Sequence, residues 1–97
     1  MSTTNLDSAY TPKGKSVVVT GFTQGIGKAI TLELIRVGAR VLGAARTHAD
    51  VDALVQHCRS EFGVDETQIA GVACDVATES GRNALVAASK SMFGDRL

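Results

Sequence analysis

A glycine-rich segment between two apolar stretches constrains the fold of this chain more than any other feature of its sequence. The segment has the sequence TGFTQGIG and covers residues 20–27, with glycines at positions 21, 25 and 27. An apolar, β-branched run, Ser16–Thr20 (SVVVT), leads into it, and apolar residues at helical spacing follow it. Glycine allows a sharp turn and a close approach of the backbone to a ligand. The sequence therefore predicts a strand, a tight turn and a helix in direct succession.

The helix predicted after this turn covers residues 26–37. Its apolar residues recur at steps of four, four and three, a spacing that places them on one stripe of an amphipathic helix: Ile26, Ile30, Leu34 and Val37. Gly38 follows directly, and it predicts that the helix ends at a residue in the left-handed conformation.

Two further strands and two further helices are predicted along the rest of the chain. The strands are Arg40–Ala45 (RVLGAA) and Gln68–Cys74 (QIAGVAC). The second helix begins at Thr47 and ends at Gly63, and the third covers Thr78–Phe93. Each of these strands and helices has either the spacing of apolar residues that is typical of its type or turn-forming residues at its ends.

The two later helices are predicted to be amphipathic. In the second helix, the residues that keep the helical period are Val51, Leu54, Val55, Cys58 and Phe62. Its first residues, Thr47 and Asp50, stand three apart in the manner of a capping box. In the third helix, one face holds Leu85, Ala88 and Met92, and residues 89–91 (SKS) are predicted to be exposed to solvent.

The alternation of strands and helices predicts an α/β fold with a parallel sheet and right-handed crossover connections. Such a unit is half of a doubly wound, Rossmann-type fold, with the strand order 3-2-1 from the outer edge inward and three layers when complete. The first strand would be central in the complete sheet. A sheet that stops at this strand has an open edge and bare apolar faces. We therefore expect the isolated chain to be marginally stable or to aggregate.

Composition excludes several classes of function. The formal net charge is zero, which argues against a surface that binds nucleic acid or anionic membranes. Residues 1–15 are polar, and no stretch approaches the ~20 apolar residues of a membrane span, so we expect a cytoplasmic protein. Cys58 and Cys74 have the spacing of no zinc or redox motif. We interpret both as small core residues rather than as a disulfide or a nucleophile.

The glycine-rich turn is also a predicted binding site for phosphate. The N-terminus of a helix leaves backbone N–H groups unpaired and has a partial positive charge. A pyrophosphate group can accept hydrogen bonds from these N–H groups, and its negative charge is attracted to the positive end of the helix. The alternative is a tight turn without a ligand, but such a turn does not need glycine at all three positions.

The pattern T-G-x-x-x-G-I-G, with a strand before it and a helix after it, resembles the glycine motif of classical short-chain dehydrogenases/reductases. The chain from the glycine turn to Arg46 is also similar to tropinone-reductase-like members of that family. The resemblance extends over residues 13–97 and corresponds to about the first third of a typical member. It implies that residues 15–97 form part of an NAD(P)-binding Rossmann domain. Residues 1–14 are rich in Ser, Thr, Asn and Asp and contain Pro12 and Gly14, and this composition predicts a flexible arm before the domain.

The resemblance implies a role for each residue of the turn. Gly21 makes the tight turn, and Gly27 lets the helix pack close to the strand. Gly25 and Ile26 face the pyrophosphate with their backbones. Two side chains of the turn lie over the adenosine ribose: Thr23 and Gln24.

The end of the second strand predicts which dinucleotide is bound. NAD-dependent folds place an acid about 20 residues beyond the glycines, where it binds the ribose 2′-hydroxyl. This chain has Ala45 there, followed by Arg46. A guanidinium binds a 2′-phosphate through two parallel hydrogen bonds, so we expect NADP(H) in preference to NAD(H). The alternative for Arg46 is an ordinary surface charge. Gln24 stands where many NADP-dependent members have a second basic residue, and His48 is interpreted as a solvated loop residue.

Asp75 and Val76, at the end of the third strand, are the predicted adenine contacts. The resemblance implies that the Asp75 carboxylate accepts a hydrogen bond from the adenine amino group and that the Val76 N–H contacts the ring. Ligands of such sheets bind at strand ends near the switch point. The alternative is that Asp75 only caps the loop before the third helix.

The residues that catalyse carbonyl reduction in this family are not found in the chain. The family uses a Ser, a Tyr and a Lys, aided by an Asn, and its Tyr-x-x-x-Lys motif lies well beyond position 97. The one tyrosine is Tyr10, with Lys13 three residues on. It precedes the first strand, at the end of the sheet away from the ligand crevice. We therefore predict no catalytic residue and no metal ligand in these 97 residues.

Taken together, these features indicate the NADP-binding N-terminal portion of an NADPH-dependent reductase of ketones or alcohols, inactive by itself. A longer form would act on a small molecule and, like most of the family, form a homo-oligomer. No nucleic-acid or membrane partner is expected. The alternatives are a non-catalytic nucleotide-binding module or a truncated gene product.

Overall fold

Three parallel strands form the sheet of this protein, and their order in space, β1-β2-β3, follows their order in the chain. The structure, a computed structural model, describes residues 14–94. The elements are β1 (Ser16–Thr20), α2 (Gly25–Arg36), β2 (Arg40–Ala45), α3 (His48–Phe62), β3 (Ile69–Ala73) and α4 (Glu79–Phe93). The predicted arm 1–14, with Tyr10 and Lys13, lies outside the described residues except for Gly14, whose N–H donates to the Gly38 carbonyl at 2.9 Å.

The predicted elements are all present, with ends that differ by a residue or so. The two strand ranges predicted for β1 and β2 are confirmed, and β3 is one residue shorter at each end than predicted. The predicted glycines at the ends of the first two helices have positive φ angles, 93° at Gly38 and 67° at Gly63. Both therefore stop their helices in a conformation that other residues rarely adopt.

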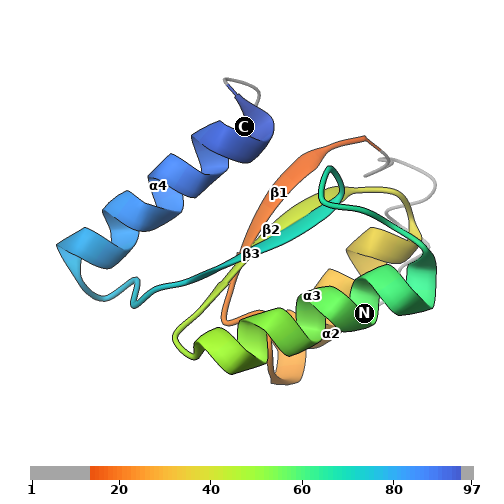
Figure 1. Cartoon of the computed structure of the whole chain (residues 1–97), viewed down its shortest axis with the longest axis horizontal. Coiled ribbons are helices and arrows are strands. Elements are labelled where there is room, and N and C mark those ends of the chain that lie inside the picture. Colours follow the sequence, from red (N-terminus) through yellow and green to blue (C-terminus); the bar gives the residue numbers. More distant parts are fainter. Residues whose placement is uncertain (1–13, 95–97) are drawn as a thin grey trace.

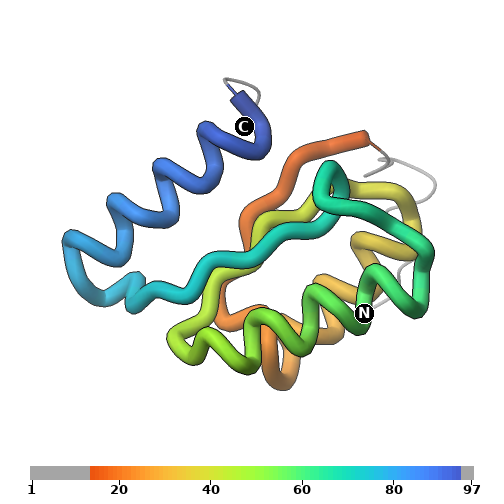
Figure 2. Tube along the Cα trace, viewed as in Figure 1, coloured from red at the N-terminus to blue at the C-terminus, as the bar shows by residue number. Residues whose placement is uncertain are grey.

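Helices cover both faces of the sheet (Figure 1). Helices α2 and α3 pack on one face, and α4 lies on the other face, against β2 and β3. Figure 2 shows the chain passing from each strand through a helix into the next strand, and the strands pair in parallel. The predicted α/β class and the strand order 3-2-1 are confirmed.

Parallel pairing brings the carboxyl ends of the strands to one edge of the sheet. Thr20 of β1 pairs with Ala44 of β2, and Ala45 pairs with Ala73 of β3. Three connections therefore leave the sheet side by side at this edge. In open α/β sheets, ligands bind outside this edge.

The core lies between the sheet and the helices α2 and α3. Its buried members are Phe22, Ile35, Val41, Val51, Leu54, Val55, Cys58 and Ile69. The helical period predicted for α3 is confirmed, because four of its five predicted residues belong to this cluster and Phe62 packs against it. The central strand β2 is buried over residues 41–44, as expected for a strand covered on both faces.

The apolar stripe predicted for α2 is only in part its buried face: Leu34 packs against the core, but the first two residues of the stripe are exposed. Ile26 is 79% exposed and Ile30 46% exposed, whereas Thr31 and Ile35 are buried. The buried face includes Gly27, which lacks a side chain and lets the first turn of the helix lie close to the preceding loop. The Thr31 hydroxyl donates to the Gly27 carbonyl at 2.8 Å, so a polar group can be buried here without losing its hydrogen bond.

Two predicted details of the later helices are wrong. Thr47 is the N-cap of α3, but its side chain makes no capping hydrogen bond. The carboxylate of Asp50 is one methylene shorter than that of the glutamate in a capping box, so it reaches back less easily. Ser89 of α4 is buried rather than exposed, while its two following neighbours are exposed. Ser89 lies four residues before the buried Phe93 and therefore shares its helix face.

Arg40 connects the start of β2 to the end of α4. Its Nη2 donates to the Met92 carbonyl at 3.0 Å, and its Nε donates to the Thr67 carbonyl at 3.0 Å. The guanidinium carbon lies 5.3 Å from the centroid of the Phe93 ring. Such a cation–π contact contributes ~0.5–1 kcal/mol at a partly exposed site. The contacts fix the far end of α4 to the amino-end edge of the sheet.

Strand β1 is an edge of the sheet in this chain. Among residues 14–94, only β2 pairs with it, and its residues are half-buried or, at Thr20, exposed. An edge strand presents unpaired N–H and C=O groups that favour pairing with another chain. The prediction that the first strand becomes an open edge is confirmed.

We expect the isolated 97-residue chain to have a free energy of unfolding below ~5 kcal/mol, the lower end for native domains, and to self-associate through the edge of β1. Urea unfolding followed by circular dichroism at several protein concentrations, together with sedimentation, measures both properties. This expectation would be contradicted by a cooperative unfolding transition of a monomer that does not depend on protein concentration and that gives a free energy of unfolding of several kcal/mol.

Candidate functional site

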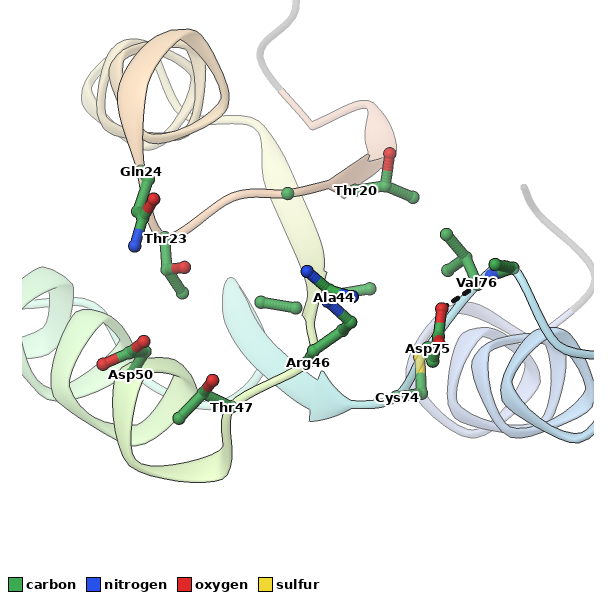
Figure 3. A pocket seen from close by; sticks show the side chains of 13 residues that line it. Thr20, Thr23, Gln24, Ala44, Arg46, Thr47, Asp50, Cys74, Asp75 and Val76 are labelled. Carbon is green, nitrogen blue, oxygen red and sulfur yellow. Dashed lines mark hydrogen bonds between the residues drawn. The ribbon is translucent and has the colours of Figure 1, made fainter.

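A cleft of about 450 Å³ opens at the carboxyl-end edge of the sheet, where the three connections leave it. Figure 3 shows side chains from all three connections around it. The first connection contributes Thr20, Gly21, Thr23 and Gln24; the second, with the end of β2, contributes Ala44, Ala45, Arg46, Thr47 and Asp50; the third contributes Cys74, Asp75, Val76 and Ala77.

The glycine turn has the backbone that its spacing predicts. Gly21 has a φ of 63° and Gly25 a φ of 56°, in the left-handed region that disfavours side chains. Gly27 is required for a different reason: a Cβ there would overlap the carbonyl oxygen of Gly21. The turn therefore needs glycine twice for conformation and once for close packing.

In the part of the chain that the structure describes, no side chain caps the free amides at the N-terminus of α2. Gln24 is the N-cap residue and makes no side-chain capping bond, and the first turn holds no acid. Helix α4 differs, since the Thr78 hydroxyl at its N-cap accepts a hydrogen bond from the Gly81 N–H at 3.0 Å. Backbone amides at an uncapped helix start bind anions, so the start of α2 suits a phosphate group.

Phe22 is a residue of the turn to which the sequence assigned no role. It is fully buried, although it lies between the exposed Gly21 and the half-buried Thr23. A Cβ on Gly43 of β2 would overlap its ring. Glycine inside a strand often marks a close approach, and this signal at Gly43 was present in the sequence.

Arg46 follows β2 and lines the cleft with an exposed side chain. In Figure 3 its guanidinium lies between the glycine turn and Asp75. Within residues 14–94 it makes no hydrogen bond or ion pair, and His48 pairs instead with Asp52, with 3.1 Å between His48 Nδ1 and Asp52 Oδ2. The donors of Arg46 are thus free to bind an anion.

Asp75 has a structural role in the loop before α4. Its Oδ1 accepts a hydrogen bond from the Ala77 N–H at 2.9 Å, and its carbonyl accepts one from the Thr78 hydroxyl at 2.9 Å. A Cβ on Gly81 would overlap the same carbonyl. Asp75 therefore caps the loop before α4, as the alternative interpretation expected. Its second carboxylate oxygen makes none of these contacts and could still accept a hydrogen bond from a ligand.

Cys74 is the one thiol in the cleft lining, and Cys58 is in the core. Burial raises the pKa of both thiols, and the nearby Asp75 carboxylate raises the pKa of Cys74 further. Both cysteines are free. A raised pKa leaves the thiol protonated at neutral pH, which does not suit a nucleophile.

The structure brings six of the nine predicted site residues to the cleft: Gly21, Thr23, Gln24, Arg46, Asp75 and Val76. The other three do not line it. Gly25 and Ile26 are exposed at the start of α2, and Gly27 packs against the turn. Thr47 and Asp50 are polar residues of the lining that the sequence assigned to a capping box rather than to the site. Their place in the first turn of α3, directly after the strand end that holds Arg46, is the signal that could have indicated their position.

Two kinds of feature are absent from the part of the chain that the structure describes. No group of three or more His, Cys, Asp or Glu side chains could hold a metal ion there. Over the same residues, no helix has the length and hydropathy to cross a membrane.

Known proteins resemble this chain in sequence and in structure. Residues 15–96 match the family model described as short chain dehydrogenase. A chloroplastic tropinone reductase homologue of Arabidopsis thaliana is 38% identical over 87% of this chain and 25% of its own length. A tropinone reductase homologue of Datura stramonium is 33% identical over 94% of this chain and 32% of its own. The likeness to tropinone-reductase-like proteins is thereby confirmed.

A solved structure shows the same fold. L-sorbose reductase of Gluconobacter frateurii, in complex with NADPH and L-sorbose, superposes with a TM-score of 0.78 at 35% identity, over 86% of this chain and 30% of the reductase. The chain thus spans between a quarter and a third of the length of these relatives. Because the family model matches most of the chain, the protein belongs to the short-chain dehydrogenase/reductase family.

Proposed function

We propose that this chain binds NADP(H) in the cleft, as the cofactor-binding portion of a short-chain reductase. The observation that carries the proposal is the exposed Arg46 guanidinium, which lines the cleft and has no acidic partner within residues 14–94. The L-sorbose reductase with the same fold was solved with NADPH, which supports a nicotinamide dinucleotide here.

The residues present fit the diphosphate and adenosine of such a cofactor. Gly25 and Ile26 would offer backbone amides at the uncapped start of α2, and Gly21 and Gly27 would shape the turn that holds them. Anions at such helix starts are stabilised by unpaired N–H groups and by the helix dipole. Two side chains of the turn would lie over the adenosine ribose: Thr23 and Gln24.

The third connection would hold the adenine. Asp75 would accept a hydrogen bond from the adenine amino group through the oxygen that the Ala77 N–H does not use. The Val76 N–H would contact the ring. When bound, NADPH supplies the hydride for carbonyl reduction; the residues of this chain bind and orient it.

Charge at the end of β2 is the basis of the proposed preference for NADP(H). A carboxylate at position 45 would accept the 2′-hydroxyl of NAD and repel a 2′-phosphate, but the residue is Ala45. Arg46 instead supplies up to five N–H donors in a planar arrangement that matches phosphate oxygens. Hydrogen bonds to charged groups contribute ~1.5–3 kcal/mol each, which corresponds to roughly tenfold selectivity or more.

We expect the chain to bind NADPH more tightly than NADH, and Arg46→Ala to weaken NADPH binding by roughly tenfold or more while leaving NADH binding little changed. Arg46→Lys keeps the charge but not the planar donor geometry, so it should lose less NADPH affinity than Arg46→Ala but bind more weakly than the unaltered chain. Titration followed by nicotinamide fluorescence, at two salt concentrations, measures these affinities.

His48→Ala is the matched control, since His48 is exposed two residues away and pairs with Asp52 rather than facing the cleft. Tighter binding of NADH by the unaltered chain would refute the preference. An equal loss of both cofactors in Arg46→Ala would show that this residue does not contact the 2′-phosphate.

The whole protein's reaction is proposed from the family. A longer form would reduce a small ketone, or oxidise the corresponding alcohol, and would assemble as a homo-oligomer. A cytoplasmic location is also a proposal; the free thiols of Cys58 and Cys74 are in keeping with a reducing compartment.

We infer that the 97 residues alone bind cofactor without reducing a carbonyl, because they contain no Tyr-x-x-x-Lys sequence. With NADPH and a panel of small ketones, the absorbance of the reduced nicotinamide should stay constant. The matching experiment on a chain extended through that motif should show oxidation of NADPH. Turnover by the 97-residue chain would contradict the inference.

A further inference from the structure

We propose that Phe22 is a positioning residue for the cofactor site: its ring, held over two glycines of the sheet, fixes the turn that would bind the diphosphate. The inference rests on the proposed function. It extends that function to a side chain that is fully buried and does not line the cleft.

The ring of Phe22 lies in the space that side chains at Gly43 and Gly71 would fill. An added Cβ on Gly43 would overlap the Cγ, Cδ2 and Cε2 atoms of the ring, and one on Gly71 would lie 3.0 Å from Cζ. Gly43 of β2 and Gly71 of β3 are partners in the parallel register. The ring therefore spans two neighbouring strands, with its tip toward β3.

Helix α3 closes this space from the other side. The same Cβ on Gly71 would lie 2.5 Å from Val51 Cγ1 and 3.2 Å from Val55 Cγ2. Both valines are buried in the same cluster as Phe22. Held between α3 and the sheet, the ring has little room to shift, since protein interiors are close-packed.

The backbone of the turn is attached at the same place. The N–H groups of Gly21 and Phe22 both donate to the Ala44 carbonyl, at 2.8 and 3.4 Å, and Ala44 follows Gly43 directly. The turn is thus fixed to the end of β2 by hydrogen bonds and by an aromatic side chain. Thr23, Gln24 and the start of α2 follow within three residues, so their position relative to Arg46 depends on this attachment.

Displacement of the turn should weaken binding without removing any group that touches the cofactor. At a catalytic site, a misplacement of about 1 Å can lower the reaction rate on the order of a hundredfold. Binding through oriented hydrogen bonds is sensitive to displacement in the same direction, because these bonds weaken away from linear geometry. The effects of substitutions at Phe22 and at the two glycines should also be non-additive, because a side chain at either glycine clashes with the ring only while the ring occupies that space.

The test is a cycle of three variants of the 97-residue chain: Phe22→Ala, Gly43→Ala, and the two combined. We expect each single change to weaken NADPH binding about tenfold. The loss in the double variant should be clearly smaller than the sum of the two single losses, because alanine at position 22 removes the ring atoms that the added methyl group on Gly43 would overlap. The apparent affinities are corrected for the folded fraction, measured by urea unfolding, since only folded chains bind.

Ile35→Ala is the control, because Ile35 is equally buried in the same core but lies at the far end of α2. It should lower stability and leave the corrected affinity unchanged. The proposal would be overturned by single variants that bind NADPH as tightly as the unaltered chain. It would also be overturned by a double variant whose loss of NADPH binding free energy equals the sum of the two single losses.

Amide hydrogen exchange without ligand separates this inference from the proposed function. Exchange at residues 21–25 should rise in Phe22→Ala and in Gly43→Ala, and it should rise no further in the double variant than in Phe22→Ala alone, with residues 63–68 as internal reference. If the unaltered chain fails to bind NADPH, the proposed function is wrong. If exchange at 21–25 stays unchanged in the variants, Phe22 does not fix the turn, whatever the chain binds.

Discussion

The first turn of α2 lies so close to the preceding loop that a single methyl group at Gly27 would overlap the Gly21 carbonyl oxygen. This backbone contact decides how α2 leaves the sheet, and thereby where its free N–H groups point. It also explains why the buried face of the helix includes Thr31, whose hydroxyl finds an acceptor in the Gly27 carbonyl. With a larger residue at position 27, the helix would stand away from the sheet, and the amides, the turn and the end of β2 would no longer share one cleft.

The three helix starts at this edge of the sheet differ in a way that matters for ligand binding. Helix α4 satisfies its own N-terminus through Thr78 and the turn at Asp75, so its amides serve the fold. Helix α2 has no such cap. Helix α3 also lacks a side-chain cap, but its first turn holds the acidic Asp50. The start of α2, beside the glycine turn, is therefore the uncapped helix start that offers an anion no opposing carboxylate in its first turn.

The fold was largely predictable because its determinants are local. Glycine spacing, the β-branched run of β1 and the alternation of periods each follow from neighbouring residues, and they predicted the element order and the glycine turn. Most of the other predicted cleft residues, Thr23, Gln24, Asp75 and Val76, were implied by the resemblance to the short-chain dehydrogenase/reductase family. The buried face of α2 was not predictable from the spacing of Ile26 and Ile30, since it depends on how near Gly27 lets the helix approach. Phe22 was missed for a related reason: its burial depends on glycines 21 and 49 positions further along the chain, and no local pattern connects them.

The charges around the cleft limit how a dinucleotide could bind there. The lining residues include one guanidinium, Arg46, against the carboxylates of Asp50 and Asp75, so the cleft has no excess of positive charge to attract polyanions in general. Affinity for a diphosphate would then have to come from oriented groups: amides fixed at a helix start and a planar guanidinium that binds two oxygens at once. Such interactions depend steeply on distance and angle, because hydrogen bonds weaken quickly away from linear geometry. A site of this kind needs a rigid turn more than it needs additional charge, which is why the packing beneath the turn has a direct bearing on what the cleft can bind.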